Sequence, residues 1–164
     1  MNLFWEELAG GLPDAAQLVR ILVRLIAAAI VGAVVGIQRE RAGKSAGLRT
    51  HMLVSLGATL FVLASVESGM DSNGLSRVIQ GIITGIGFIG GGAILKQTEE
   101  GHVKGLTTAA GIWMTSALGV AVGLGRYGAA LLGSALTWIV LAIIVQIELR
   151  IERAREEREN RERT

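Results

Sequence analysis

Long runs of apolar residues alternate with short charged segments along this chain. Each run is long enough to cross a lipid bilayer as a helix, which takes roughly 17–25 residues. The pattern therefore predicts an all-α membrane protein with five transmembrane helices. We expect the spans at residues 18–37, 51–67, 78–95, 106–125 and 127–147, with an N-terminal segment outside the membrane at residues 1–17 and a charged tail at residues 148–164.

The composition agrees with a membrane protein. Apolar residues make up 51% of the chain, and 23 residues are glycine. Glycine is common in transmembrane helices, where a small residue lets two backbones approach closely. The chain has no cysteine, which excludes a disulfide framework and a thiolate metal site. The first residues, MNLFWEEL, include acidic but no basic residues, so we expect the first span to be an uncleaved anchor rather than a signal peptide.

The distribution of basic residues predicts the orientation. The connections at residues 38–50 and 96–105 and the tail from Glu148 hold most of the 16 basic residues. With five spans, these three segments lie on the same side of the membrane. Because cytoplasmic segments are enriched in Lys and Arg, we expect the N-terminus outside and the C-terminus in the cytoplasm. Opposite charges at i, i+4 spacing in the tail favour a solvated helical extension of the last span.

The segment GIGFIG at residues 85–90 matches the G-x-G-x-x-G pattern of dinucleotide-binding loops. Such a loop needs a preceding strand and an acidic residue about 20 positions later, and neither fits this uncharged apolar run. Two interpretations remain. The glycines either let helices pack tightly, or break the third span into a discontinuous helix at a functional site.

Pairs of glycines at G-x-x-x-G spacing occur in three of the predicted spans. The spacing places both glycines of a pair on one helix face, where two helices can approach closely. This pattern indicates tight helix packing and a homo-oligomer, which we take to be a dimer. The pairs are Gly32/Gly36, Gly81/Gly85, Gly87/Gly91 and Gly119/Gly123.

Three blocks of sequence carry a resemblance to a known family. They read RLIAAAIVGAVVGIQRERAGKSAGLRTHMLVSLGATLF at 24–61, GIITGIGFIGGGAIL at 81–95 and VKGLTTAAGIWMTSALGVAVGLG at 103–125. In this order and spacing they resemble the MgtC/SapB family of bacterial inner-membrane proteins. The resemblance covers residues 18–147 and implies about five spans. It also implies links to growth in low magnesium, to survival inside macrophages and, in some members, to restraint of the proton-translocating ATP synthase.

The chain departs from the family pattern in two places. Family members commonly carry Glu-Arg-Glu after the first span, whereas this chain has Gln38 at the first of these positions. If that Glu bound a cation or a basic partner, we expect this chain to bind it less well. Longer members also carry a folded cytoplasmic domain, where this chain has only the charged tail. The chain therefore resembles the short SapB-type members.

The loop after the first span is the first candidate site. Its charges are typical of a topology signal and of contacts with anionic lipid headgroups. Its match to the family in the motif RERAGKSAGLRT also favours a binding surface for an anion or an acidic partner. The candidate residues are Arg39, Glu40, Lys44, Gly47, Arg49 and Thr50.

The second candidate site joins the glycine-rich third span to the segment KGLTT at residues 104–108. One of the two threonines is expected to cap the fourth span. Alternatively, their hydroxyls and the exposed amides face the third span as an anion site. The tryptophan of the fourth span is expected to pack between helices. The candidate residues are Gly85, Gly87, Phe88, Gly90, Gly105, Thr107, Thr108 and Trp113.

Two further predictions concern single charged or titratable residues. Arg24 lies inside the first span, where a charge needs a partner or must snorkel to the surface. We expect a structural ion pair with Glu67, with snorkelling as the alternative. His51 and His102 have no neighbouring ligands at metal-binding spacing, so we expect ordinary interfacial residues. Metal binding elsewhere stays open, and no cofactor is expected.

The function class follows from what the spans lack. No acidic residue lies in the middle of a predicted span, which disfavours a Mg²⁺ pore built from carboxylates. No nucleophile–base pair or pair of catalytic carboxylates stands out, which disfavours an enzyme. With the resemblance, the sequence favours a non-enzymatic modulator of another membrane complex, such as the ATP synthase or a transporter. It would contact membrane lipids and no nucleic acid. A Mg²⁺ or other ion transporter is the alternative, and a structural membrane subunit is a third reading.

Overall fold

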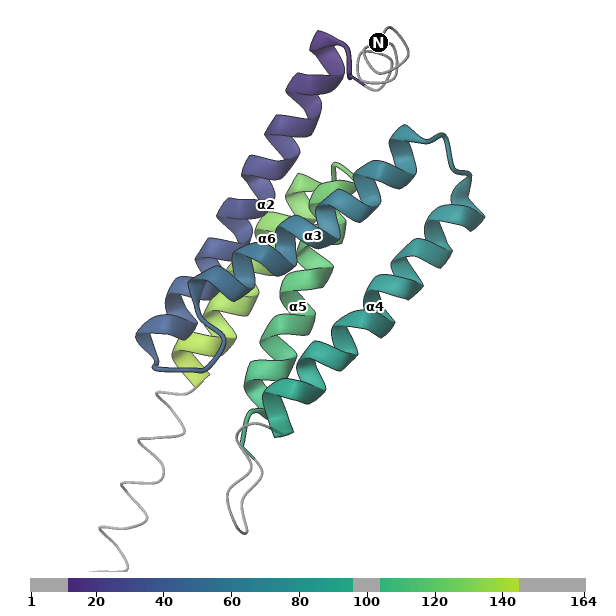
Figure 1. Ribbon diagram of the computed structural model, residues 1–164. Coiled ribbons are helices and arrows are strands. Elements are labelled where there is room, and N and C mark those ends of the chain that lie inside the picture. Colours follow the sequence, from purple (N-terminus) through teal and green to yellow (C-terminus); the bar gives the residue numbers. More distant parts are fainter. Residues whose placement is uncertain (1–11, 96–103, 145–164) are drawn as a thin grey trace, which may run out of the picture.

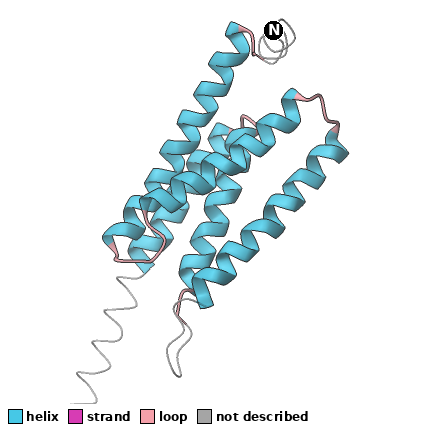
Figure 2. Ribbon diagram, viewed as in Figure 1, coloured by secondary structure: helices cyan, strands magenta, loops and turns pink. Residues whose placement is uncertain are grey.

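The computed structural model describes residues 12–95 and 104–144, and every regular element in these ranges is helical (Figure 1, Figure 2). The predicted all-helical class is confirmed. Four helices are long and apolar enough to cross a membrane, and a fifth apolar helix is shorter. The helices are α2 (Ala15–Arg41), α3 (Leu48–Glu67), α4 (Ser72–Leu95), α5 (Leu106–Gly123) and α6 (Tyr127–Ile139), which continues as the π-helix η1 (Val140–Ile144).

Some predicted features lie outside the described residues. These are most of the N-terminal segment at 1–17, the part of the third connection that holds His102, and the charged tail at 148–164. The orientation of the chain in the membrane stays a prediction.

The first helix is longer than predicted because its N-terminus is capped. Asp14 Oδ1 accepts a hydrogen bond from the backbone N–H of Gln17 at 2.7 Å, and Gln17 Oε1 accepts one from the N–H of Asp14 at 3.0 Å. This reciprocal capping box satisfies two donors that would otherwise lack partners. It starts α2 at Ala15 rather than at residue 18.

Tight packing through glycine is confirmed at two of the four predicted pairs. Helix α3 packs against both α2 and α5. A Cβ atom on Gly32 of α2 would lie 2.6 Å from the carbonyl oxygen of His51 on α3. A Cβ atom on Gly119 of α5 would lie 2.5 Å from the carbonyl oxygen of Ser55, also on α3. Their pair partners, Gly36 and Gly123, approach α3 just as closely, so both pairs set the helix spacing.

Helix α4 corrects one interpretation of the glycine-rich third span and limits the other. It is a continuous α-helix, so the discontinuous-helix hypothesis is wrong. A Cβ atom on Gly81, Gly85, Gly87 or Gly91 would meet nothing within 4 Å, so these glycines do not mediate packing within the chain. In lipid an unbroken helix keeps every backbone group hydrogen-bonded, which outweighs the low helix propensity of glycine. Gly81 and Gly85 line a groove beside α3, whereas Gly87 lies on an open face of α4, which is at the edge of the bundle (Figure 1).

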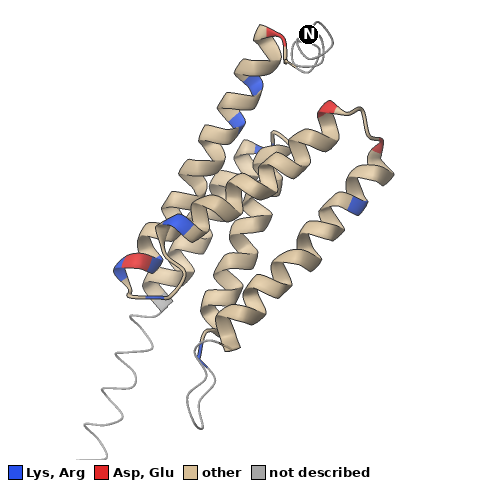
Figure 3. Cartoon of the chain, viewed as in Figure 1, with Lys and Arg blue, Asp and Glu red and all other residues tan. Residues whose placement is uncertain are grey.

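The acidic residues of the described chain lie at helix ends (Figure 3). Asp14 precedes α2, Glu40 lies in its last turn, Glu67 ends α3, and Asp71 precedes α4. The spans between these ends carry no carboxylate among the described residues. Between these ends, the oxygen ligands that the described residues offer a cation belong to hydroxyl, amide and backbone groups.

Candidate functional site: a buried polar cluster between α2, α3 and α5

Arg39, in the last turn of α2, is buried in the bundle. Its side chain is only 1% exposed, and its Nη2 atom donates to Thr108 Oγ1 at 2.8 Å. Thr108 lies in the first turn of α5 and is equally buried. The structure thus joins one residue from each of the two predicted sites. It does so at the junction of the α2 C-terminus and the α5 N-terminus.

His51 lies next to this pair, and its predicted interfacial location is wrong. The imidazole is fully buried, and Nδ1 lies 2.7 Å from Thr115 Oγ1. Thr115 already donates its hydroxyl hydrogen to the Gly111 carbonyl at 2.9 Å. Because a hydroxyl has one hydrogen, Thr115 accepts from His51, and Nδ1 carries the proton. The ring packs against α5 at Gly111, where a Cβ would lie at an ordinary contact distance of 3.5 Å from His51 Cε1.

The polar cluster continues along α3 as a stripe. Ser55 and Thr59 follow His51 at four-residue intervals, and both are fully buried. Thr59 Oγ1 donates to the Gly119 carbonyl at 2.8 Å, whereas Ser55 Oγ has no hydrogen-bond partner among the described residues. Residues at i, i+4 and i+8 share one helix face. This spacing is the sequence signal that would have identified the stripe.

The cluster holds a buried positive charge. No carboxylate pairs with Arg39 among the described residues, and its Nε atom has no hydrogen-bond partner there. A buried charge without a counter-charge is costly, so the hydrogen bond to Thr108 is important for the guanidinium. The guanidinium therefore places a fixed positive charge at this end of the bundle.

Hydrogen bonds to the last turn of α2 hold the connection between α2 and α3. Glu40 Oε2 accepts the backbone N–H of Leu48 at 2.7 Å, so a carboxylate in α2 caps the N-terminus of α3. The Lys44 N–H returns to the Arg39 carbonyl at 3.0 Å, and Gly43 adopts a φ of 65°, which glycine tolerates. Lys44 is exposed on this connection, and Arg49 is exposed in the first turn of α3.

Gly47 and Thr50, also predicted for this site, are partly buried. The Cα of Gly47 lies beside the Glu40 carboxylate, since a Cβ there would be 2.8 Å from Oε2. Gly47 therefore leaves space for the carboxylate that caps α3.

The second predicted site divides into two parts. Gly105 precedes α5 and has a φ of 96°. A Cβ there would lie 2.6 Å from the Ala93 carbonyl oxygen, so glycine lets the start of α5 approach the end of α4 closely. Gly90 also faces α5, at ordinary contact distance from Ala109. The remaining predicted residues of this site lie away from the cluster: Gly85, Gly87, Phe88 and Thr107 are exposed, and Trp113 is half-exposed beside a small cavity between α4 and α5.

Arg24 corrects another prediction. Its Nη1 atom donates to the Gly123 carbonyl at 2.7 Å, and no ion pair with Glu67 forms among the described residues. The last carbonyls of a helix have no partner within the helix and carry partial negative charge. The C-terminus of α5 therefore supplies the acceptor that a carboxylate was expected to supply.

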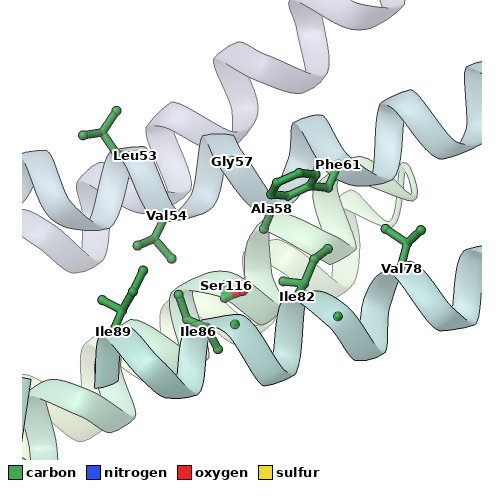
Figure 4. A pocket seen from close by; sticks show the side chains of 12 residues that line it. Leu53, Val54, Gly57, Ala58, Phe61, Val78, Ile82, Ile86, Ile89 and Ser116 are labelled. Atoms are coloured by element: carbon green, nitrogen blue, oxygen red, sulfur yellow. The ribbon is translucent and has the colours of Figure 1, made fainter. Parts of the chain in front are cut away.

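An apolar groove separates α3 from α4 (Figure 4). It has a volume of about 620 Å³, and Ser116 is the one polar side chain in its lining. Figure 4 shows Phe61 from α3 and Ile82 and Ile86 from α4 among the side chains around it. Such a surface suits apolar chains and offers no ligand set for a hydrated ion. Nor do the described residues contain a group of three His, Asp or Glu side chains that could hold a metal.

Comparison with known proteins identifies the family. The sequence model of the MgtC family matches residues 25–150, which include every residue of the buried cluster. The chain belongs to the MgtC family. No solved structure matches this MgtC-family chain.

Three curated relatives illustrate the relationship. The chain is 41% identical to "Putative magnesium transporter YhiD" of Escherichia coli K12 over 124 residues, covering 71% of this chain and 57% of the relative. It is 43% identical to "Protein SrpB" of Synechococcus elongatus, covering 66% of this chain and 65% of the relative. It is 42% identical to "Protein MgtC" of Salmonella typhimurium, covering 59% and 40%. The chain thus spans about half of the length of these relatives.

Proposed function

We propose that this MgtC-family chain is a non-enzymatic modulator of another complex in the bacterial inner membrane, such as the proton-translocating ATP synthase or a transporter. In this role it supports adaptation to low magnesium or to acid and host stress. The observation that carries the proposal is the ordered basic connection between α2 and α3. Its backbone is held by Glu40 and by the turn at Gly43, while Lys44 and Arg49 are exposed.

An ordered, charged surface suits the recognition of an acidic partner. Because the connection is already fixed, little conformational entropy is lost when a partner binds. The two exposed cations steer an acidic surface toward the connection and fix its orientation. Arg39 supports the arrangement from within, since its bond to Thr108 ties the end of α2 to α5.

A magnesium transporter is the second candidate, because one relative is named a putative magnesium transporter. Mg²⁺ favours oxygen ligands, above all carboxylates, and it gives up its waters reluctantly. The described spans offer a buried guanidinium and an apolar groove instead, and a fixed positive charge repels a divalent cation. These features favour the modulator.

ATP-driven proton pumping tests the modulator. Inverted membrane vesicles from a host without its own family member are prepared with and without the full-length chain, and acidification is followed with a pH-sensitive dye. We expect the chain to lower the pumping rate. The double variant Lys44→Gln/Arg49→Gln should not inhibit, so the pumping rate should equal that of vesicles without the chain. The matched variant Arg77→Gln/Arg126→Gln removes two exposed cations elsewhere and should still inhibit.

Mg²⁺ uptake into proteoliposomes that hold the purified chain tests the alternative. The measurement uses an imposed gradient and membrane potential. Saturable uptake that is absent from empty liposomes would overturn the modulator and establish transport.

In the pumping experiment, equal inhibition by both double variants would show that the basic connection is not the contact surface.

A further inference from the structure

The apolar groove between α3 and α4 is open to the surroundings of the bundle. Leu53 and Phe61 of α3 and Ile89 of α4 line it and are exposed, so its side toward the membrane is not covered by the chain. Figure 4 shows its two walls, with Leu53 near Ile89 at one end and Phe61 near Val78 at the other. A molecule in the surrounding membrane can therefore enter it directly.

Glycines on both walls keep the groove wide. Gly57 of α3 and Gly81 and Gly85 of α4 line it, and a Cβ atom on any of the three would meet nothing within 4 Å. The facing walls therefore do not fill the space with their own side chains. An empty space of this size would cost its lining the van der Waals contacts on one side, so a molecule from the membrane is favoured there.

The dimensions of the groove select the kind of occupant. Its wall on α4 runs from Val78 to Ile89, which is roughly 17 Å along the helix axis. This length is close to one leaflet, about half of the roughly 30 Å hydrocarbon core. A helix with its side chains is about 10–12 Å wide, so a segment of the same length would need roughly 1,300 Å³. The groove has about 620 Å³, which suits an extended hydrocarbon chain and is too small for a helix.

A cation lies at the outer end of this groove. Arg77 directly precedes Val78 and shares a helix face with Gly81, one turn further along α4. Its side chain is exposed and forms no ion pair with a described residue. A guanidinium binds phosphate oxygens through paired N–H groups. Because the groove is one leaflet long, Arg77 lies at the depth where the phosphate of a lipid in that leaflet is found.

We propose that the groove holds one acyl chain of a glycerophospholipid whose phosphate binds Arg77. The chain lies between α3 and α4, against the three glycines of the two walls. In the predicted orientation α4 begins outside, so the lipid belongs to the outer leaflet of the inner membrane. These contacts specify a phosphate and a long chain. The group attached beyond the phosphate extends into water and is not selected.

Native mass spectrometry of the full-length chain tests the proposal. The chain is purified in detergent, stripped of lipid and mixed in turn with four probes at equal concentration. These are a phosphatidylethanolamine, the diacylglycerol with the same two chains, the free fatty acid of the same chain, and a phosphatidylethanolamine whose chains are too short to cross a leaflet. Bound probe is counted per protein chain. We expect the long-chain phospholipid to be retained about fivefold more strongly than the diacylglycerol, which lacks the phosphate, and the short-chain form to be lost.

Two matched pairs of variants locate the bound lipid. Gly85→Leu fills the groove with a side chain and should lower phospholipid retention about tenfold, whereas Gly87→Leu adds the same side chain on the open face of α4 and should not. Arg77→Gln should remove the preference over diacylglycerol. Arg126→Gln removes an exposed cation at the same end of the bundle but outside the groove, and should keep the preference. Leucine favours helix more than glycine does, so both leucine variants are expected to fold, which their melting temperatures check.

The other outcomes would overturn the proposal. Equal retention of phospholipid and diacylglycerol, or an Arg77→Gln variant that behaves like Arg126→Gln, would show that no phosphate binds at Arg77. Equal retention by the two leucine variants would show that the lipid lies outside the groove. Displacement of the phospholipid by the fatty acid would assign the groove to a free acid. Lipid-free dimers that become monomers in Gly85→Leu would assign it to a second copy of the chain.

Discussion

Arg39 Nη2 and Thr108 Oγ1 lie 2.8 Å apart, in a bond that joins the end of α2 to the start of α5 across 69 positions of the chain. Both side chains are almost completely buried. A guanidinium in such a place depends on each hydrogen bond that it makes, because no carboxylate of the described chain balances its charge. The bond therefore holds together the end of the bundle that carries the basic connection.

Replacing Thr108 with valine should destabilise the protein. The two side chains have nearly the same shape, but valine cannot accept the bond from Arg39 and leaves a buried donor unpaired. We expect a loss of roughly 1–3 kcal/mol in the free energy of unfolding, measured as reduced thermal stability in detergent. The neighbouring Thr107→Val variant makes the same change at an exposed position and should be close to neutral. Equal effects of the two variants would mean that the Arg39 bond contributes nothing.

Replacing Gly32 with alanine should separate α2 from α3. The added Cβ would overlap the His51 carbonyl at 2.6 Å, and this contact is backbone, which cannot rotate away. Overpacking of this kind costs about 1–3 kcal/mol. The matched Gly81→Ala variant adds the same atom in open space on α4, so it should be neutral or stabilising through helix propensity. Thermal unfolding of the two variants in parallel would measure the difference, and a Gly32→Ala protein as stable as the parent would contradict the close approach.

Replacing Gln38 with glutamate should loosen η1 from α2. A carboxylate cannot donate to the Leu141 carbonyl, and two acceptors would then face each other across the present distance of 2.7 Å. Hydrogen exchange at residues 140–144 should therefore become faster than in the parent chain. The control is Gln80→Glu, which makes the same change on the exposed surface of α4. Unchanged exchange in Gln38→Glu would show that the amide does not hold η1.

The open face of α4 gives a test of the predicted homodimer. The chain has no cysteine, so a single introduced thiol reports contacts between copies without background. We expect Gly87→Cys to form disulfide-linked dimers in native membranes, because Gly87 is exposed and a side chain there would meet no other residue of the chain within 4 Å. Leu132→Cys on α6 is the comparison, since Leu132 is also exposed to the surroundings of the bundle. Monomers only, or equal crosslinking at both positions, would remove the α4 interface.

The hydrophobic pattern predicted the helices because length and apolar content are local properties. The helix ends were less accurate, since they depend on particular side chains such as the Asp14 cap. The G-x-x-x-G spacing also identified the Gly32/Gly36 and Gly119/Gly123 pairs, but it could not distinguish them from the pairs in α4, which contact no other helix of the chain. Whether a glycine meets another helix depends on how the helices are arranged, which spacing along one helix does not determine.

The sequence predicted individual residues of the candidate site but not which of them contact each other. Arg39 and Thr108 were both candidates, but nothing in the sequence indicated that they bind each other. His51 was assigned to the interface because it lies near a charged connection, whereas its neighbours Ser55 and Thr59 show that its helix face is polar and buried. The partner of Arg24 was missed for a different reason. A backbone carbonyl is available at every helix end and leaves no signal in the residue types.

The polar stripe on α3 also sets an order for the biogenesis of this protein. During synthesis α3 leaves the ribosome well before α5, which carries the partners Thr115 and Gly119. Until α5 is inserted, His51 and Thr59 lack these partners in a membrane where polar groups are poorly tolerated. A nascent chain that stops before residue 106 would therefore expose these unpaired polar side chains to the membrane quality-control proteases. Insertion of α5 supplies their hydrogen-bond partners and ends the exposure.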